Sequence, residues 1–181
     1  MFVVVSGSNR PGCNTIKVAR RVAELLRADE REVRLLDLRE LPPSLFAPES
    51  YAEKPADFAP FQEAIDAARG ILTVVPEYNG SFPGALKYFV DMLRFPESLA
   101  DVPCAFVGLS AGRWGGVRAV EQLEQVFLYR HAQPYGRRVF LPDIFAALDD
   151  DGRLVDPALD ARLAELVRGF GAFVDGAVGR A

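Results

Sequence analysis

The sequence predicts an α/β protein in which a parallel sheet lies between two layers of helices. Short, uninterrupted apolar runs alternate along the chain with segments of helical periodicity. Runs without polar alternation are typical of strands that helices cover on both faces. Because strands that alternate with helices need right-handed crossover connections, we expect a three-layer sandwich of five parallel strands and five helices.

The first part of the chain supplies two of these strands. An aromatic and β-branched run predicts a strand over residues 2–5, and apolar spacing predicts a helix over 15–28 with Asn14 as its cap. A second strand is expected over 33–36, a long irregular, Pro-rich loop over 41–60, and a helix over 60–69 that Gly70 ends.

The second part continues the alternation. Strands are expected over 71–75 and 104–109, and a short fifth strand over 138–141. The helix after 71–75 buries Leu86, Phe89, Val90 and Leu93, and the next helix buries Val117, Val120, Leu123 and Phe127. The last helix begins at Pro157 behind the capping residue Asp156.

Length and composition favour a small globular protein, with one domain over residues 1–181. Half of the residues are hydrophobic, and 21 basic against 25 acidic residues leave a net charge of -4, so we expect no nucleic-acid partner. We find no signal peptide and no apolar run of the roughly 18 residues that a membrane span needs, and therefore expect no membrane partner and a cytoplasmic location. The two cysteines form no CxxC pair, so no metal site is expected.

The loop over residues 6–15 separates a buried strand from a helix N-terminus. It contains hydroxyl and amide side chains and Arg10, beside backbone N–H groups at the positive end of a helix dipole. These groups favour phosphate binding, although a tight turn with a helix cap would also account for part of the pattern. Cys13 and Asn14 stand where a Walker A loop needs Lys and Ser or Thr, and Asn9 replaces the second glycine of a dinucleotide fingerprint. With these two kinds of loop excluded, the remaining candidate ligand is a monophosphate such as that of FMN.

The loop over residues 76–84 follows the third strand. Its Pro and Gly residues predict an irregular backbone, while Tyr78 offers a flat apolar face and Asn79 an amide that donates and accepts. A binding site for a flavin ring needs a flat apolar face and hydrogen-bonding groups of this kind, although the same residues also occur in an ordinary surface loop.

A family resemblance is carried by three stretches: Gly7-Ser8-x-Arg10 with Asn14-Thr15; Pro76-Glu77-Tyr78-Asn79-Gly80-Ser81-x-Pro83-Gly84-x-Leu86-Lys87; and Ser110-x-Gly112 with Gly115-Gly116-x-Arg118. With them the chain closely resembles the NADPH-dependent FMN reductases, flavodoxin-like proteins that include quinone, azo-dye and chromate reductases. The resemblance covers essentially the whole chain. It departs in the first loop, where many members have Ser in place of Cys13.

The resemblance implies a flavodoxin-like fold with strand order 2-1-3-4-5 and helices on both faces. It implies that the FMN phosphate is held by Ser8, Arg10, Asn14 and Thr15, that the isoalloxazine is lined by Pro76, Glu77, Tyr78 and Asn79, and that Ser110 and Gly112 border its other edge. Cys13 and Gly80, in the same two loops, are also expected to belong to the cofactor site. The protein is then expected to be a homodimer or homotetramer.

The implied activity is that of an FMN-dependent oxidoreductase with NADPH or NADH as co-substrate. Hydride passes from the nicotinamide to flavin N5, and the electrons then pass to a quinone, azo, metal-oxyanion or flavin acceptor by ping-pong kinetics. We expect no catalytic side chain, because positioning of the bound FMN carries the reaction. Arg10, Arg113 and Arg118 suit an anionic NADPH. Arg113 and Trp114 could wall its nicotinamide, although packing of Trp114 at a subunit interface would equally account for it.

Two alternatives stay open at this point. One is a flavodoxin-type electron carrier, which binds FMN without turning over a nicotinamide. The other is an interaction module that has lost its flavin. Cys13 could have a redox role or could simply be a small residue in place of Ser.

Overall fold

The centre of the molecule is a parallel β-sheet. The structure, a computed structural model, describes residues 1–178; residues 179–181 of the expected domain lie outside the described residues. The strands are β1 Phe2–Ser6, β2 Val33–Asp37, β3 Gly70–Pro76, β4 Pro103–Leu109, β5 Gln133–Pro134 and β6 Val139–Leu141. The sheet order is β2-β1-β3-β4-β5, and β6 also pairs with β4, which confirms the expected order.

The fifth position of the sheet differs from the expectation, because two short strands share it. β5 pairs with the start of β4 and β6 with its end. The predicted strand over 138–141 corresponds to β6, while β5 was not predicted. Gln133 N and Tyr135 N donate to Val102 O and Cys104 O at 3.0 and 2.7 Å, so Pro134 between them lies with its nitrogen at the free edge of the sheet, where a missing N–H costs no hydrogen bond.

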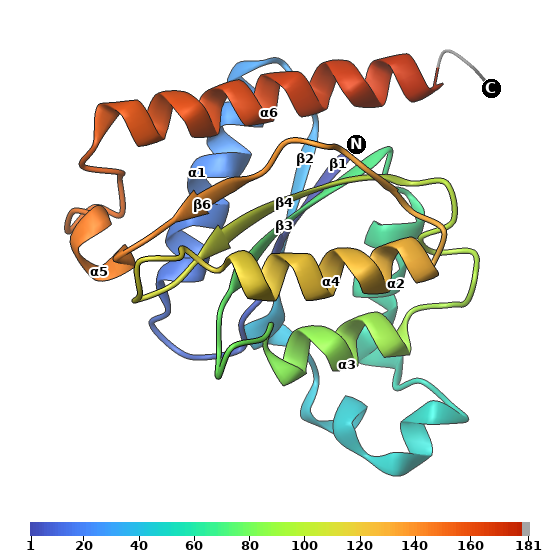
Figure 1. Ribbon diagram of the computed structural model, residues 1–181. Helices are drawn as coiled ribbons and strands as arrows, with labels where there is room; N and C mark the ends of the chain where they lie inside the picture. Colours follow the sequence, from blue (N-terminus) through green and yellow to red (C-terminus); the bar gives the residue numbers. More distant parts are fainter. Residues whose placement is uncertain (179–181) are drawn as a thin grey trace.

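Helices cover both faces of the sheet (Figure 1). Helices α1 Asn14–Ala28 and α6 Pro157–Val178 pack on one face, and helices α2 Ala59–Asp66, α3 Gly84–Met92 and α4 Val117–Tyr129 pack on the other. Successive residues of β1 alternate between the two: Phe2 and Val4 belong to the core beneath α1 and α6, and Val3 and Val5 to the core beneath α2, α3 and α4. Every residue of β1, β3 and β4 is buried, so the prediction of strands covered on both faces is confirmed.

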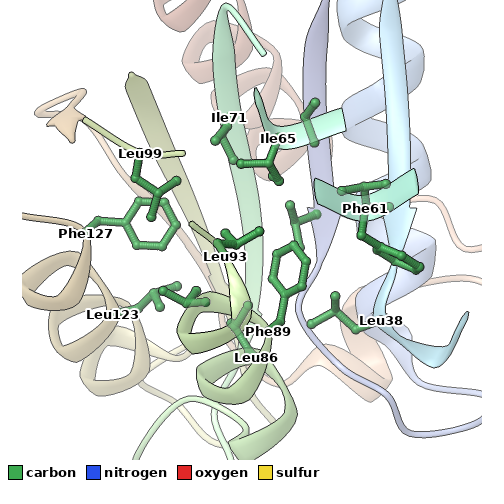
Figure 2. Close-up of a cluster of buried hydrophobic side chains, with 14 of the residues drawn as sticks. Leu38, Phe61, Ile65, Ile71, Leu86, Phe89, Leu93, Leu99, Leu123 and Phe127 are labelled. Atoms are coloured by element: carbon green, nitrogen blue, oxygen red, sulfur yellow. The ribbon is translucent and has the colours of Figure 1, made fainter. Parts of the chain in front are cut away.

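The core beneath α2, α3 and α4 contains an aromatic cluster (Figure 2). The ring centroids of Phe58, Phe61 and Phe89 lie 6.1 to 6.3 Å apart, the spacing of favourable aromatic pairs. Leu86 and Phe89 of α3 are fully buried here. Because α3 begins directly after the loop that follows β3, this packing fixes one end of that loop.

Three sequence predictions need correction. The stretch over 41–60 is not irregular: it contains the 3₁₀ helices η2 Pro43–Phe46, η3 Pro48–Tyr51 and η4 Ala56–Phe58, behind η1 Leu38–Glu40. Prolines start η2 and η3 because their fixed φ suits a first helical position. Gly70 begins β3 instead of ending a helix. A short helix, α5 Ile144–Ala147, was not predicted.

The two predicted helix caps have different outcomes. Asp156 caps α6, since its Oδ1 accepts from Ala158 N at 2.8 Å. Asn14, by contrast, is the first residue of α1, and the capping position belongs to Cys13, whose side chain makes no capping hydrogen bond. None of the helices within residues 1–178 is long and apolar enough to cross a membrane.

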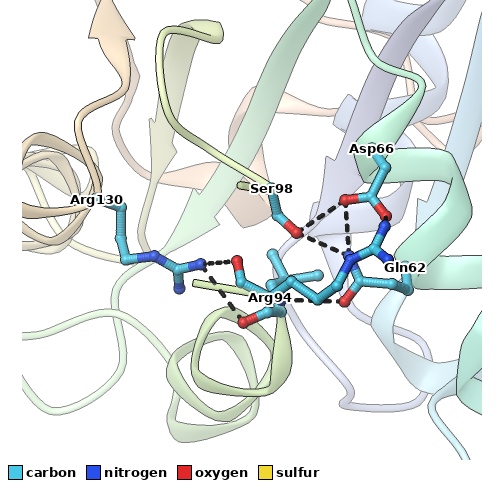
Figure 3. A network of polar contacts seen from close by, with 6 residues as sticks. Gln62, Asp66, Arg94, Ser98 and Arg130 are labelled. Carbon is cyan, nitrogen blue, oxygen red and sulfur yellow. Dashed lines mark hydrogen bonds and ion pairs between the residues drawn. The ribbon is translucent and has the colours of Figure 1, made fainter. Parts of the chain in front are cut away.

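Arg130 ties the C-terminal ends of α3 and α4 together (Figure 3). It is only 5% exposed, and its guanidinium donates to the carbonyl oxygens of Val90 at 2.8 Å and Arg94 at 2.6 Å. Burial lowers the pKa of Arg130. Beside it, Asp66 of α2 accepts from Ser98 Oγ at 2.8 Å and forms an ion pair with Arg94. This polar network fixes α2, α3 and α4 relative to one another.

The substitution Arg130→Met is expected to lower the free energy of unfolding by about 2 kcal/mol, because it leaves buried carbonyl groups without their charged donor. Urea unfolding of the parent and variant proteins measures this difference in free energy of unfolding. The exposed Arg20→Met is the matched control, with an expected change within about 0.5 kcal/mol. Equal effects of the two substitutions would contradict a structural role of Arg130.

Candidate functional site

A cavity of about 290 Å³ lies at the carboxyl edge of the sheet. β1 ends there at Ser6, β3 at Pro76 and β4 at Leu109, and in parallel sheets ligands bind at this edge. The cavity is lined by residues 10–15, 76–78, 109–111 and 144–145. Three of these four segments are the ends of strands or the loops that follow them, and the fourth belongs to α5.

The first turn of α1 presents free hydrogen-bond donors to this cavity. Among the residues that the structure describes, the backbone N–H groups of Asn14, Thr15 and Ile16 have no acceptor, and no acidic residue lies in this turn. Gly12 precedes the turn with a φ of 65°. Arg10 is exposed and has no carboxylate partner within residues 1–178. Free N–H groups at the positive end of a helix dipole, beside a free guanidinium, form an anion-binding site.

Ser8 connects the first loop to the loop after β3. Its side chain is fully buried, and its hydroxyl is hydrogen bonded to the Tyr78 hydroxyl at 2.7 Å. The same Ser8 oxygen accepts from Arg10 N at 3.1 Å. Ser8 therefore does not line the cavity but holds Arg10 and Tyr78 in place on two of its walls.

The loop after β3 is a tight turn with fixed ends. Glu77 N donates to Leu109 O at 3.0 Å, and Tyr78 and Ser81 exchange backbone hydrogen bonds of 2.8 and 3.1 Å. Between them, Asn79 and Gly80 have φ values of 53° and 77°. A left-handed pair of this kind is typical of Asn-Gly turns. The turn directs Pro76, Glu77 and Tyr78 to the cavity.

One face of α4 clamps this turn from outside. Arg118 Nη1 donates to Glu77 Oε1 at 3.0 Å, Gln122 Nε2 to Gly80 O at 3.1 Å, and Ser81 Oγ to Gln122 Oε1 at 2.6 Å. Arg118 and Gln122 are four residues apart and so share one helix face. The ion pair offsets part of the charge of Glu77, whose second carboxylate oxygen, Oε2, is buried without a partner among the described residues.

The loop after β4 joins α5 along the other wall. Ser110 N donates to Leu141 O at 3.2 Å, and Ile144 N donates to Ser110 O at 3.0 Å. Gly116, which ends this loop, has a φ of 86°, and a Cβ there would lie 2.7 Å from Leu109 N. Only glycine, which has no Cβ, allows the backbone at this position to lie so close to Leu109. The segment from residue 109 to residue 116 is therefore held against β4 and α5.

The structure brings most of the predicted site residues together. Those that line the cavity are Arg10, Cys13, Asn14, Thr15, Pro76, Glu77, Tyr78 and Ser110; those that do not are Ser8, Asn79, Gly80 and Gly112. Arg113 and Trp114 are exposed and lie outside the lining, with the Arg113 guanidinium 5.8 Å from the Trp114 ring.

The sequence prediction missed Leu109, Ile144 and Phe145, which also line the cavity. Leu109 looks like any other strand residue in the sequence. Ile144 and Phe145 lie in the unpredicted helix α5, and only the parallel pairing of β6 with β4 brings them to this edge. A usable signal was the apolar run over residues 144–148, which lies between Asp143 and the acidic residues 149–151.

The two cysteines have different surroundings. Cys13 lines the cavity at the capping position of α1. Cys104 lies in β4 at 1% exposure, and burial raises the pKa of its thiol. These surroundings make Cys104 an unreactive core residue.

Comparison with protein families identifies a match over residues 1–146, to the NADPH-dependent FMN reductases. An NAD(P)H-dependent FMN reductase of Pseudomonas aeruginosa is 36% identical over 99 residues, about half of each chain. Longer matches exist to quinone reductases. That of Pseudomonas putida is 31% identical over 84% of this chain and 83% of its own, and that of Escherichia coli is 29% identical over 95% and 94%.

Solved structures with the same fold include two kinds of flavoprotein. FerB of Paracoccus denitrificans, a flavoenzyme NAD(P)H:(acceptor) oxidoreductase, superposes with a TM-score of 0.80 at 22% identity over 97% of both chains. A Pseudomonas aeruginosa flavodoxin variant superposes with a TM-score of 0.62 at 20% identity, over 94% of this chain and 98% of its own. Both likenesses concern the fold, which confirms the predicted flavodoxin-like architecture.

The hydroxyl pair Ser8–Tyr78 can be tested by a double-mutant cycle. Tyr78→Phe is expected to lower the free energy of unfolding by about 1 kcal/mol and Ser8→Ala by about 1 to 2 kcal/mol, since Ser8→Ala also removes the acceptor of Arg10 N. The double variant should lose little more than Ser8→Ala alone, because both substitutions remove the same hydroxyl pair. Urea unfolding of the four proteins gives the coupling energy. Additive effects would contradict the link between the two loops.

Proposed function

The chain belongs to the NADPH-dependent FMN reductase family, and from this premise we propose that it reduces quinone-class acceptors with FMN held in the cavity at the carboxyl edge of the sheet. Family membership makes it an NAD(P)H-dependent oxidoreductase with FMN as cofactor. The observation that supports the place of the FMN is the set of free N–H groups on the first turn of α1, beside Arg10.

The residues present suit FMN. The phosphate would be held by the N–H groups of Asn14, Thr15 and Ile16 and by Arg10, with Thr15 and Cys13 beside it. The isoalloxazine would lie against Pro76, Glu77 and Tyr78 on one side and Ser110 on the other. The chemistry that FMN supplies when bound is two-electron transfer between a nicotinamide and an acceptor.

This chain contributes position and electrostatics to that chemistry. α4 holds the turn of residues 77–81 through Arg118 and Gln122, and Ser8 holds Tyr78. The N-terminus of α1 and Arg10 add positive potential, which favours anionic groups. Hydride transfer requires no side chain to act as general acid, general base or nucleophile, so we still expect that the reaction has no catalytic side chain.

Quinones are the acceptors that we propose, because quinone reductases of two organisms align with most of this chain. The balanced reaction is NAD(P)H, a proton and a quinone giving NAD(P)⁺ and a hydroquinone. Both substrates would use the same face of the site in turn, which gives ping-pong kinetics. Azo compounds, metal oxyanions and free flavins are the other acceptor classes that the sequence suggested.

The decisive experiment is anaerobic mixing of the FMN-loaded protein with NADPH or NADH. We expect rapid loss of the visible absorbance of the oxidised flavin, and its return when menadione is added. A flavin that neither nicotinamide reduces would favour the electron-carrier alternative, for which the flavodoxin likeness, at 20% identity, supports only the fold.

Thiol labelling tests where the FMN lies. Cys13 is 9% exposed and lines the cavity, whereas Cys104 is 1% exposed, lies in the core and has a raised pKa. In folded apoprotein we expect N-ethylmaleimide to label Cys13 only, and saturating FMN to slow that labelling at least about tenfold by covering the thiol. Mass spectrometry follows the rate, and Cys13→Ser, which should take up no label while folded, is the control. Unchanged labelling with FMN would place the cofactor elsewhere.

We also propose that the protein is a homodimer or homotetramer, as the resemblance implies. Exposed Phe95 and Tyr129 line a groove between α3 and α4, and a second copy would cover them. Sedimentation velocity checks this, and a monomer at micromolar concentration would contradict it. The cytoplasmic location remains a prediction.

A further inference from the structure

Phe145 is an exposed aromatic side chain at the edge of the cavity. It is 77% exposed, yet it lines the cavity, where Tyr78 is the other aromatic residue. Leaving a phenylalanine in water forgoes the stabilisation that burial would give. An exposed apolar ring beside a ligand cavity is typical of a binding surface.

The backbone beneath Phe145 is held in place. Ile144 N donates to Ser110 O at 3.0 Å and Asp143 N to Gly112 O at 3.3 Å, while Asp143 O accepts from Ala146 N and Ala147 N at 2.8 and 3.0 Å. The side chain of Ile144 is buried in the core beneath α1 and α6. The exposed ring is thus carried by a short helix whose position is fixed on both sides.

The walls of the cavity differ in chemistry. The wall formed by residues 10–15 carries Arg10 and free N–H groups, whereas Leu109, Ile144 and Phe145 form an apolar wall. A phosphate belongs at the first wall. A planar apolar ring belongs at the second, since aromatic rings stack favourably on one another.

We propose that Phe145 determines acceptor specificity by stacking on the ring of planar aromatic acceptors, which the enzyme thereby prefers over small inorganic ones. This inference rests on the proposed function, because it concerns the acceptor of the same site. Phe145 would contact the oxidised acceptor before that acceptor receives electrons from the flavin, and so acts on binding of the acceptor.

The test compares two acceptors in steady state. Menadione takes two electrons and two protons from NADPH and H⁺, whereas two ferricyanide ions take one electron each and leave a proton in solution. In Phe145→Ala we expect the ratio of kcat/KM for menadione to that for ferricyanide to fall about five- to tenfold, mainly through the KM for menadione. Phe145→Tyr should restore the ratio. Val155→Ala removes an exposed apolar side chain that does not line the cavity, and should leave the ratio unchanged.

A second readout needs no turnover. Menadione is titrated into the oxidised, FMN-loaded protein without nicotinamide, and the flavin difference spectrum gives its Kd. We expect Phe145→Ala to raise this Kd about five- to tenfold and Phe145→Tyr to leave it within about twofold of the parent value. If the parent protein is not reduced by NADPH, the proposed function fails, and this titration still tests Phe145.

Three results would overturn the inference. An unchanged Kd for menadione in Phe145→Ala would show that the ring makes no such contact. An equal loss of kcat/KM for both acceptors would indicate a general defect of the site. A change of sedimentation coefficient in Phe145→Ala would assign the ring to a contact between copies of the chain.

Discussion

Parallel pairing of β1 with β3, and of β3 with β4, is the constraint on which the site depends. It brings three loops that are far apart in the sequence to one edge of the sheet. Gly7 allows the close approach: its N–H donates to Val74 O at 2.9 Å, and a Cβ at this position would lie 2.7 Å from the same oxygen. A larger residue would push the first loop away from β3 and separate Ser8 from Tyr78.

The cavity at this edge of the sheet has one charged wall and one apolar wall. The positive end of α1 and Arg10 form an anion site, while the carboxylate of Glu77 is paired with Arg118 of α4. On the remaining surface, Tyr78 lies where the ring of the cofactor is proposed to bind and Phe145 where the ring of the acceptor is proposed to stack. A cofactor with a phosphate at one end and a planar ring at the other matches this division. The helices behind the loops keep the walls in register, since α4 holds the turn after β3 and α5 holds the loop after β4.

Much of this could be predicted from the sequence, because buried strands and helix stripes have local patterns. These patterns predicted most strands and helices, whereas the strand order, now confirmed, and the site residues, most of which line the cavity, came from the family resemblance. What failed depends on tertiary contacts. Ser8 is a residue type that often binds phosphate, but its hydroxyl is hydrogen bonded to that of Tyr78, 70 positions along the chain. Phe145 lies in a four-residue helix without a periodic pattern, and the division of the fifth strand follows from pairing with both ends of β4. Neither is visible in a local window.

The central claim is that the N-terminus of α1 and Arg10 hold the phosphate of FMN. Its most direct test compares the Kd of the apoprotein for FMN with that for riboflavin, which has the same ring and no phosphate, by quenching of flavin fluorescence. Charge-assisted hydrogen bonds to the phosphate should make FMN bind at least about 100-fold more tightly, and Arg10→Ala should reduce that ratio. Equal affinities for the two flavins would contradict the account.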